Sequence, residues 1–149
     1  MEQFSCVEDR LAIQEVNQRY ATHIDFHEID EWVGLFTRDA VFDEREFGSP
    51  LSTGHDEIRA YGQELVKTVQ FALHHMTTHV ISDLTATSAR GIAFSIVEYL
   101  LKDGFHARTQ VIYKDRYEKI NGRWLIAERV LKQTVPTEIL NEKSTSPAA

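Results

Sequence analysis

The sequence predicts an α+β fold in which three N-terminal helices pack on a curved antiparallel sheet. Apolar residues recur at helical spacing in the first part of the chain, and after Gln70 the period of the pattern changes to two. Turn signals then separate four stretches rich in β-branched and aromatic residues. Helices followed by strands in this order are typical of the α+β class. The 149 residues and 42% apolar content suit one domain, which we expect over residues 1–141.

The first helix is predicted from a start signal and an apolar stripe. Ser5-Cys6-Val7-Glu8 has the spacing of a capping box, in which a hydroxyl and an acid satisfy free backbone N–H groups. Ile13, Val16, Tyr20 and Ile24 then recur at helical intervals. We expect one side of this helix to be buried.

Two further helices are predicted before the sheet begins. A short one runs from Ile29 to Phe36, ahead of the strand-like pair Val41-Phe42. The stretch from Glu44 to Gly54 contains glycine and proline and is predicted to be a loop. A third helix begins at about Asp56, with one stripe formed by Ile58, Tyr61, Leu65 and Val69.

The second half of the chain is predicted to be an antiparallel meander. Its strands are expected at Phe71 to Leu84, Ser88 to Leu101, Phe105 to Ile120 and Arg123 to Val135. Asn121-Gly122 between the last two is a strong hairpin signal. The polar tail from Glu142 to Ala149 is expected to be disordered.

Composition limits the classes of partner. The net charge of −7 arises from 23 acidic and 16 basic residues without a basic run, which disfavours nucleic acid and anionic membranes. Cys6 is the single cysteine, so no internal disulfide can form, and the N-terminus lacks the pattern of a secretion signal. No apolar run reaches membrane-spanning length. We expect a cytoplasmic protein.

The strongest chemical signal is a histidine-rich strand together with one acid. Leu73-His74-His75-Met76-Thr77-Thr78-His79-Val80 contains three histidines, and Asp25 lies between the apolar residues Ile24 and Phe26. A histidine titrates near neutral pH, and an acid in apolar surroundings can orient or charge it. The two residue types together indicate a general-base dyad.

The order of these residues carries a resemblance to a known family. Tyr20 precedes Asp25 by five residues, His75-Met76 follows later, and a hairpin Tyr113 to Trp124 reads Tyr-Lys-Asp-Arg-Tyr-Glu-Lys-Ile-Asn-Gly-Arg-Trp. From about Glu8 to Val135 the chain resembles the SnoaL-like branch of the NTF2-like superfamily. The likeness includes scytalone dehydratase, bile-acid 7α-dehydratase and hexachlorocyclohexane dehydrochlorinase.

The resemblance implies a cone-shaped α+β barrel with a deep pocket, no cofactor and elimination chemistry driven by a His-Asp dyad. His75 falls on the catalytic histidine of the family, Asp25 on its aspartate partner and Tyr20 on the tyrosine of the bile-acid enzyme. The relatives named above form homotrimers, which implies a homo-oligomer here, with a trimer favoured over a dimer.

The chain departs from scytalone dehydratase at several pocket positions. Ile24 stands where that enzyme has a tyrosine beside the aspartate, and Glu44 stands in place of its second pocket tyrosine. Val111 and Tyr113 replace the Ser and Asn of its later strand. These differences concern the substrate and leave the dyad in place.

The chemistry is consistent with the residue types themselves. Removing a proton beside a carbonyl and expelling a β-leaving group needs a base, a group that holds it in one tautomer, and a donor to the developing oxyanion. His75, Asp25 and Tyr20 supply these roles. Aromatic and apolar residues would line a pocket for a flat or polycyclic organic molecule. Those expected there, together with the polar substrate-binding candidates, are Phe26, Phe36, Phe47, Tyr61, Met76, His79, Phe94, Tyr99, Tyr113, Arg129 and Leu131.

Structural roles remain open for each of the catalytic candidates. Asp25 can cap the following helix, His75 can be a core histidine bonded to backbone, and Tyr20 lies on an apolar stripe. Strict alternation places His75 and His79 on one face of the strand and His74 with Met76 on the other. The family position favours His75, and His74 is expected to pack outward or at a subunit contact.

Other polar residues also have two interpretations. Arg129 can bind an acidic substrate group, although an ion pair with an acid on a neighbouring strand is favoured. Glu98 is expected on the outer face of the sheet. His23, Asp25, His27 and the strand histidines are metal-ligand types, but their spacing matches no metal motif. We therefore expect no metal.

The sequence favours a cofactor-independent lyase, in particular a dehydratase acting on a hydroxylated cyclic or polycyclic ketone. Three alternatives stay open. A ketosteroid-isomerase-like enzyme would use Asp25 as a carboxylate base without His75. The chain can instead be a non-catalytic ligand-binding module, or a β-subunit of a larger oxygenase, because this fold hosts all of these functions.

Overall fold

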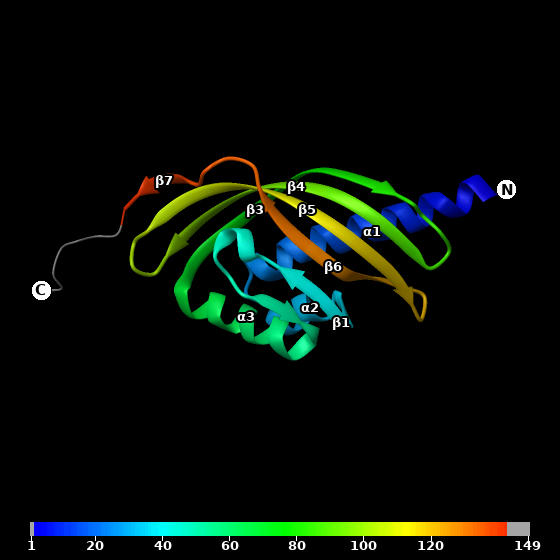
Figure 1. The fold of residues 1–149 in the computed structure, drawn as a ribbon, viewed down its shortest axis with the longest axis horizontal. Helices are drawn as coiled ribbons and strands as arrows, with labels where there is room; N and C mark the ends of the chain where they lie inside the picture. The colour runs from blue at the N-terminus through cyan, green and yellow to red at the C-terminus, as the bar shows by residue number, and fades with distance from the viewer. Residues whose placement is uncertain (1, 143–149) are drawn as a thin grey trace, which may run out of the picture.

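A computed structural model describes residues 2–142 of the chain, with side chains from residue 6 onward. It contains three α-helices and a curved sheet that remains open, with the helices on its concave side (Figure 1). The expected disordered tail lies outside the described residues, apart from Glu142. Within the described part, no helix has the length and apolar character needed to cross a membrane.

The first helix, α1, spans Glu2–Asp25 and therefore starts before the predicted capping box. The residues that it buries recur at intervals of three and four, which is why one side of the helix faces the sheet. They are Ile13, Val16, Asn17, Tyr20, Ala21 and Ile24.

The next two helices are shorter and pack against each other. Helix α2 covers Ile29–Val33, ending before the predicted Phe36, and α3 covers Gly54–Thr68. Gly62 of α3 makes their close approach possible, since a Cβ there would lie 3.0 Å from the side chain of Ile29. The predicted stripe of α3 is confirmed for Ile58, which is fully buried.

The sheet has the strand order β2-β1-β6-β5-β4-β3, and β7 pairs with β5. The long antiparallel meander predicted from the sequence is confirmed as β3 to β6. The sheet as a whole is mixed, because β1 runs parallel to β6. The bounds are β1 Phe36–Asp43, β2 Leu51–Thr53, β3 Val69–Ser82, β4 Ser88–Leu101, β5 His106–Ile120, β6 Arg123–Gln133 and β7 Glu138–Asn141.

The turns of the meander follow the predicted chemistry. Asn121 and Gly122 both have positive φ, at 51° and 77°, as a two-residue hairpin turn requires. Ile120 pairs with Arg123 directly across this turn. The predicted loop from Glu44 to Gly54 additionally contains a 3₁₀ turn, Arg45–Phe47, and the short strand β2.

An irregularity in β3 decides which side chains face inward. The register with β4 shifts between Met76 and Thr78, so one extra residue stands on β3. His74 pairs with buried Val97 before the shift, and His79 pairs with buried Ala93 after it. Both histidines therefore lie on the inner face of the sheet, which strict alternation from the sequence did not allow.

Candidate active site

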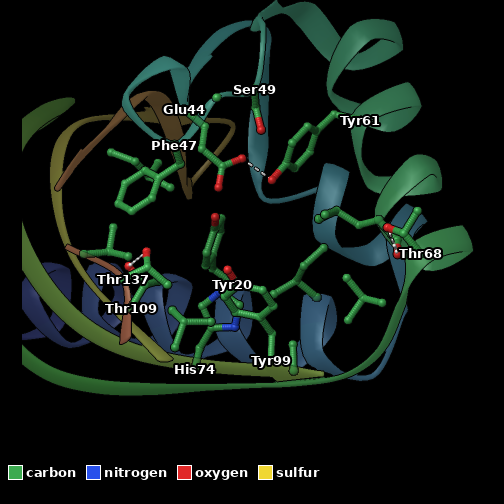
Figure 2. Close-up of a pocket in the computed structure, with 18 of the residues that line it drawn as sticks. Tyr20, Glu44, Phe47, Ser49, Tyr61, Thr68, His74, Tyr99, Thr109 and Thr137 are labelled. Atoms are coloured by element: carbon green, nitrogen blue, oxygen red, sulfur yellow. Dashed lines mark hydrogen bonds between the residues drawn. The ribbon is translucent and has the colours of Figure 1, made fainter. Parts of the chain in front are cut away.

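A pocket of about 500 Å³ lies between the inner face of the sheet and the helices (Figure 2). Its walls come from the three helices, the loop after β1, strands β3 to β6 and the segment after β6. Aromatic rings make up much of the lining: Tyr20, Trp32, Phe47, Tyr61, Tyr99 and Tyr113. Polar side chains enter at separate points: Glu44, Ser49, Thr68, His74, Thr109 and Thr137.

His74 and Asp25 form a dyad at the pocket wall. The imidazole Nδ1 lies 2.5 Å from Asp25 Oδ1, and the backbone N–H of His74 donates to Asp25 Oδ2 at 2.8 Å. An ionised carboxylate only accepts, so the proton shared with it belongs on Nδ1. Nε2 is then left as the free basic nitrogen, because it makes no hydrogen bond to any described residue.

The histidine of the dyad is thus His74, which corrects the prediction of His75. The side chain of His75 is exposed and pairs with Ile96 on the outer face of the sheet. Successive side chains of a strand point to opposite faces, so only one of two neighbouring histidines can reach Asp25. The expectation that His74 packs outward is wrong for the same reason. Asp25 is the last residue of α1 and pairs with a histidine as predicted, but that histidine is His74 and not His75.

Tyr20 and Tyr113 form the floor of the pocket beside the dyad. Their rings meet edge to face at 5.8 Å, and the Tyr20 ring lies 6.2 Å from that of His74. Burial raises the pKa of both hydroxyls, so both remain protonated donors at neutral pH. The predicted placement of Tyr20 and Tyr113 at the pocket is confirmed.

Arg129 lies beneath these two rings and not in the pocket. Its guanidinium carbon is 4.2 Å from the ring centre of Tyr20 and 4.3 Å from that of Tyr113. It is fully buried and holds Asp115 through two hydrogen bonds of 2.9 and 2.8 Å. The favoured interpretation, an ion pair with an acid on the neighbouring strand, is confirmed, and the role as a substrate-binding residue is corrected.

Glu44 enters the pocket on the side opposite His74 (Figure 2). The hydroxyl of Tyr61 donates a hydrogen bond to its Oε2. Burial raises the pKa of this carboxyl, although the hydroxyls of Tyr61 and Ser49 and the charge of His74 act in the other direction. Comparison with the family identified Glu44 as a residue that replaces a pocket tyrosine, but it predicted no role for this carboxyl. That substitution was the signal that could have found it.

The aromatic lining is predicted in part. Phe47, Tyr61, Tyr99 and Leu131 line the pocket as expected. Phe36 is buried in the core next to Trp32, and half-buried Met76 packs against the core. Neither of these two lines the pocket.

Three predicted binding residues lie elsewhere. Phe26 follows the end of α1 and is 71% exposed, and Phe94 is exposed on the outer face of β4. His79 faces inward but contacts the hydroxyl of Tyr117 at 3.2 Å, toward the other end of the sheet. Periodicity along a strand gives its two faces, but not which end of the inner face borders a cavity.

A second polar group lies at the edge of the pocket. The hydroxyl of Thr137 donates to that of Thr109 at 3.2 Å, and both line the cavity. Glu46 also borders it, but its carboxylate is engaged by Lys132 at 3.0 Å and by the backbone N–H of Gln133 at 2.8 Å. Glu98 lies on the outer face as expected, where it pairs with His106 and Arg108.

The donor set does not suit a metal ion. Among the side chains that the structure describes, residues 6–142, no three His, Cys, Asp or Glu gather as ligands would. His23, one of the residue types considered for a metal, pairs with Glu28 at 2.5 Å instead. The pocket is lined by the imidazoles of His27 and His74, the carboxyls of Glu44 and Glu46, and several hydroxyls around an apolar interior, which is a set suited to acid–base chemistry.

Comparison with known proteins agrees with this architecture. Residues 5–130 match the model of the SnoaL-like domain. The chain belongs to the SnoaL-like domain family, within the NTF2-like superfamily. The resemblance predicted from the sequence is thereby confirmed. No curated protein sequence matches the chain.

Solved structures of similar fold include two from Novosphingobium aromaticivorans. A candidate aromatic ring hydroxylase is 26% identical, with a TM-score of 0.85 and coverage of 89% of this chain and 94% of that one. A candidate scytalone dehydratase is 21% identical, with a TM-score of 0.84 and coverage of 99% and 97%. LinA is 18% identical, with a TM-score of 0.85 and coverage of 99% and 100%. At these low identities, the similarity to the candidate scytalone dehydratase and to LinA shows a shared fold.

Proposed function

We propose that this SnoaL-like protein is a cofactor-independent lyase that acts on a small cyclic or polycyclic ketone and uses the His74–Asp25 dyad as its base. The observation that carries the proposal is the 2.5 Å contact between His74 Nδ1 and Asp25 Oδ1 at the wall of a pocket. Structural neighbours named as a candidate scytalone dehydratase and as a hexachlorocyclohexane dehydrochlorinase support elimination as the reaction class.

The proposed base step follows from the geometry of the dyad. Asp25 holds the proton on Nδ1, so Nε2 of His74 can take a proton from the carbon beside the carbonyl. The resulting imidazolium is stabilised by the carboxylate that already contacts it. Positioned proton transfer of this kind contributes about 10²–10⁴-fold to the rate.

The proposed oxyanion step uses the phenols of the pocket floor. As the α-carbon loses its proton, negative charge develops on the carbonyl oxygen of the substrate. Tyr20 lies next to His74 and Tyr113 lies next to Tyr20, and both are protonated donors that can hydrogen-bond to that oxygen. Their buried position favours a fixed orientation, which is what makes such donors effective.

An isomerase that uses Asp25 as its direct base is less well supported. Both carboxylate oxygens of Asp25 are occupied by His74, one through the ring and one through the backbone N–H. The Asp25 side chain is only 7% exposed and does not border the pocket. A protein that only binds ligands would not need this free imidazole nitrogen. The experiment below distinguishes such a binding module from a lyase.

The test uses 3-hydroxy-1-tetralone, a bicyclic β-hydroxyketone whose loss of water yields 1-naphthol. We expect the wild type to form 1-naphthol and His74→Ala to lose about 10²–10⁴-fold in kcat/KM, because the base is removed. Naphthol fluorescence gives the rate directly.

His75→Ala is the matched control, because this neighbouring side chain lies exposed on the other face of β3. It should keep wild-type activity. Retention of full activity by His74→Ala, or no turnover of the ketone by the wild type, would count against the proposal.

A further inference from the structure

Glu44 is a pocket carboxyl that the base step leaves unused and that, unlike Glu46, pairs with no described lysine or arginine. It follows directly after β1 and enters the pocket from the side opposite His74 (Figure 2). The groups around it come from every wall of the pocket. Tyr61 donates a hydrogen bond to it, while Ser49, His74, Tyr20, Tyr99 and Tyr113 lie within electrostatic reach.

This carboxyl differs from its neighbours in having no lysine or arginine partner among the described residues. The neighbouring acids are all engaged, since Asp43 pairs with Arg45 at 2.8 Å and Glu46 pairs with Lys132 at 3.0 Å. Among the described residues, by contrast, no lysine or arginine forms an ion pair with Glu44. A carboxyl that is half-buried without a cation holds its proton to higher pH than an exposed one, so it can serve as an acid.

An acid at this position matters because leaving groups differ in what they need. A hydroxyl group departs easily only if a proton reaches its oxygen as the carbon–oxygen bond breaks. Chloride departs as a stable anion without a proton. A pocket that places an acid opposite its base therefore favours a hydroxyl leaving group over chloride.

Resting on the lyase function proposed above, we propose that Glu44, oriented by Tyr61, is the acid that protonates the leaving oxygen, so that the site selects substrates that lose water over substrates that lose halide. His74 Nε2 removes the α-proton, and the electron pair of the C–H bond forms the carbon–carbon double bond. The β carbon–oxygen bond breaks, and its oxygen takes the Glu44 proton and leaves as water. Proton transfer from the His74 imidazolium to the Glu44 carboxylate restores the enzyme.

The experiment compares two ketones that give the same product. 3-Hydroxy-1-tetralone and 3-chloro-1-tetralone both yield 1-naphthol, one by loss of water and the other by loss of hydrogen chloride. The test variant is Glu44→Gln, whose amide oxygen can still accept the Tyr61 hydrogen bond. We expect kcat for the hydroxyketone to fall about 10²–10⁴-fold. For the chloroketone, after subtraction of its uncatalysed rate, we expect a change of less than about threefold, since no proton donor is needed.

Two controls make the comparison specific. Asp43→Asn removes the adjacent carboxylate, which bonds to Arg45 outside the pocket, and should leave both rates unchanged. Turnover of the chloroketone by Glu44→Gln also shows that this variant is folded and keeps its base.

Each result has one meaning. Equal loss of both reactions in Glu44→Gln, or loss of neither, would overturn the assignment of Glu44 while leaving the lyase function intact. Conversion of neither ketone by the wild type would overturn the lyase function itself, and the role of Glu44 with it.

Discussion

Two clusters on the inner face of the sheet use the same residue types, yet only the cluster at His74 lines the pocket described above. At the pocket, His74 pairs with Asp25 and lies beside Tyr20. Further along the same strand, His79 contacts Tyr117, whose hydroxyl donates to Asp115 at 2.6 Å. A histidine, an acid and a tyrosine are present in both places.

The clusters differ in charge compensation and in space. Asp115 is neutralised by Arg129, and the Nη2 of Arg129 also donates to Asn17 at 2.7 Å. The side chains of Asp115 and Arg129 are both fully buried. At the pocket, His74 keeps a free ring nitrogen, and open volume lies in front of it. The comparison teaches that residue type alone does not make an active site. His79 also keeps a ring nitrogen, Nδ1, without a hydrogen bond to any described residue, but that atom is buried, so a base needs room for a substrate in addition.

Matched substitutions of the two acids give the largest expected effects. Asp25→Asn keeps the size of the side chain, but its amide can donate to His74 Nδ1 and so place the imidazole proton on Nε2. That tautomer cannot act as a base, and we expect kcat to fall about 10²–10⁴-fold with little loss of stability. Asp115→Asn leaves the Arg129 charge buried without a counter-ion, which costs about 3–5 kcal/mol of unfolding free energy.

The 1-naphthol assay and urea denaturation measure the two effects independently. The distinction between the clusters would be lost if Asp115→Asn reduced kcat as strongly as Asp25→Asn in protein that remained folded. It would also be lost if Asp25→Asn destabilised the protein by several kcal/mol, because the dyad would then be a structural pair like the buried one.

The sequence predicted the fold and the composition of the site better than its exact members. Helical and strand periodicity gave α1, α3 and the meander, because both depend on which side chains are buried. The extra residue between Met76 and Thr78 was not predictable, since a bulge depends on pairing with β4 and not on local pattern. It moved His79 to the inner face. The choice between His74 and His75 failed because loose motifs leave alignment uncertain by one residue, and one residue inverts the face of a strand.

Strand β1 and Glu44 illustrate a second limit. The parallel pairing of β1 with β6 joins segments more than eighty residues apart, from Phe36 to Ile126, which no local signal encodes. That pairing sets where Glu44 leaves the sheet and enters the pocket. Family position identified Glu44 as unusual, but its orientation toward His74 required the three-dimensional arrangement.

A substitution at Gly91 tests whether the cluster of His79, Tyr117 and Asp115 is too tightly packed to admit another side-chain atom. We expect an effect on stability of intermediate size. A Cβ at this position would lie 2.9 Å from Tyr117 Cε2 and 3.3 Å from His79 Nε2, so Gly91→Ala must displace a packed ring. Overpacking of this kind costs about 1–3 kcal/mol. Thermal unfolding should show a lower Tm, while kcat changes little because the pocket is formed by other residues.

Gly34→Ala is the matched control for that experiment. Its Cβ would meet backbone oxygens at 3.4 Å, and Gly34 already has helical φ and ψ. Alanine there should be neutral or slightly stabilising. If Gly91→Ala were as stable as Gly34→Ala, the second cluster would have room to adjust, and its contrast with the pocket would be smaller than the distances indicate.

The smallest expected effect is a pH dependence of stability from His79. Burial lowers the pKa of this imidazole, and the Arg129 charge acts in the same direction, whereas Asp115 opposes both. Because the folded-state pKa lies below the unfolded value of about 6.5, the unfolded chain binds the proton first as pH falls. The stabilisation from neutral His79 is therefore complete above about pH 6.5 and is lost as the pH falls toward the folded-state pKa, at no more than about 1.4 kcal/mol per pH unit.

Urea denaturation from pH 7 to 5 should show a smaller decline in unfolding free energy for His79→Gln than for the wild type. Subtracting one curve from the other removes the contribution of Glu44, which both proteins share. His75→Gln, exposed on the opposite face, should follow the wild-type curve. Parallel curves for the wild type and His79→Gln would mean that His79 takes up its proton equally well in the folded protein, as a histidine beside open solvent would.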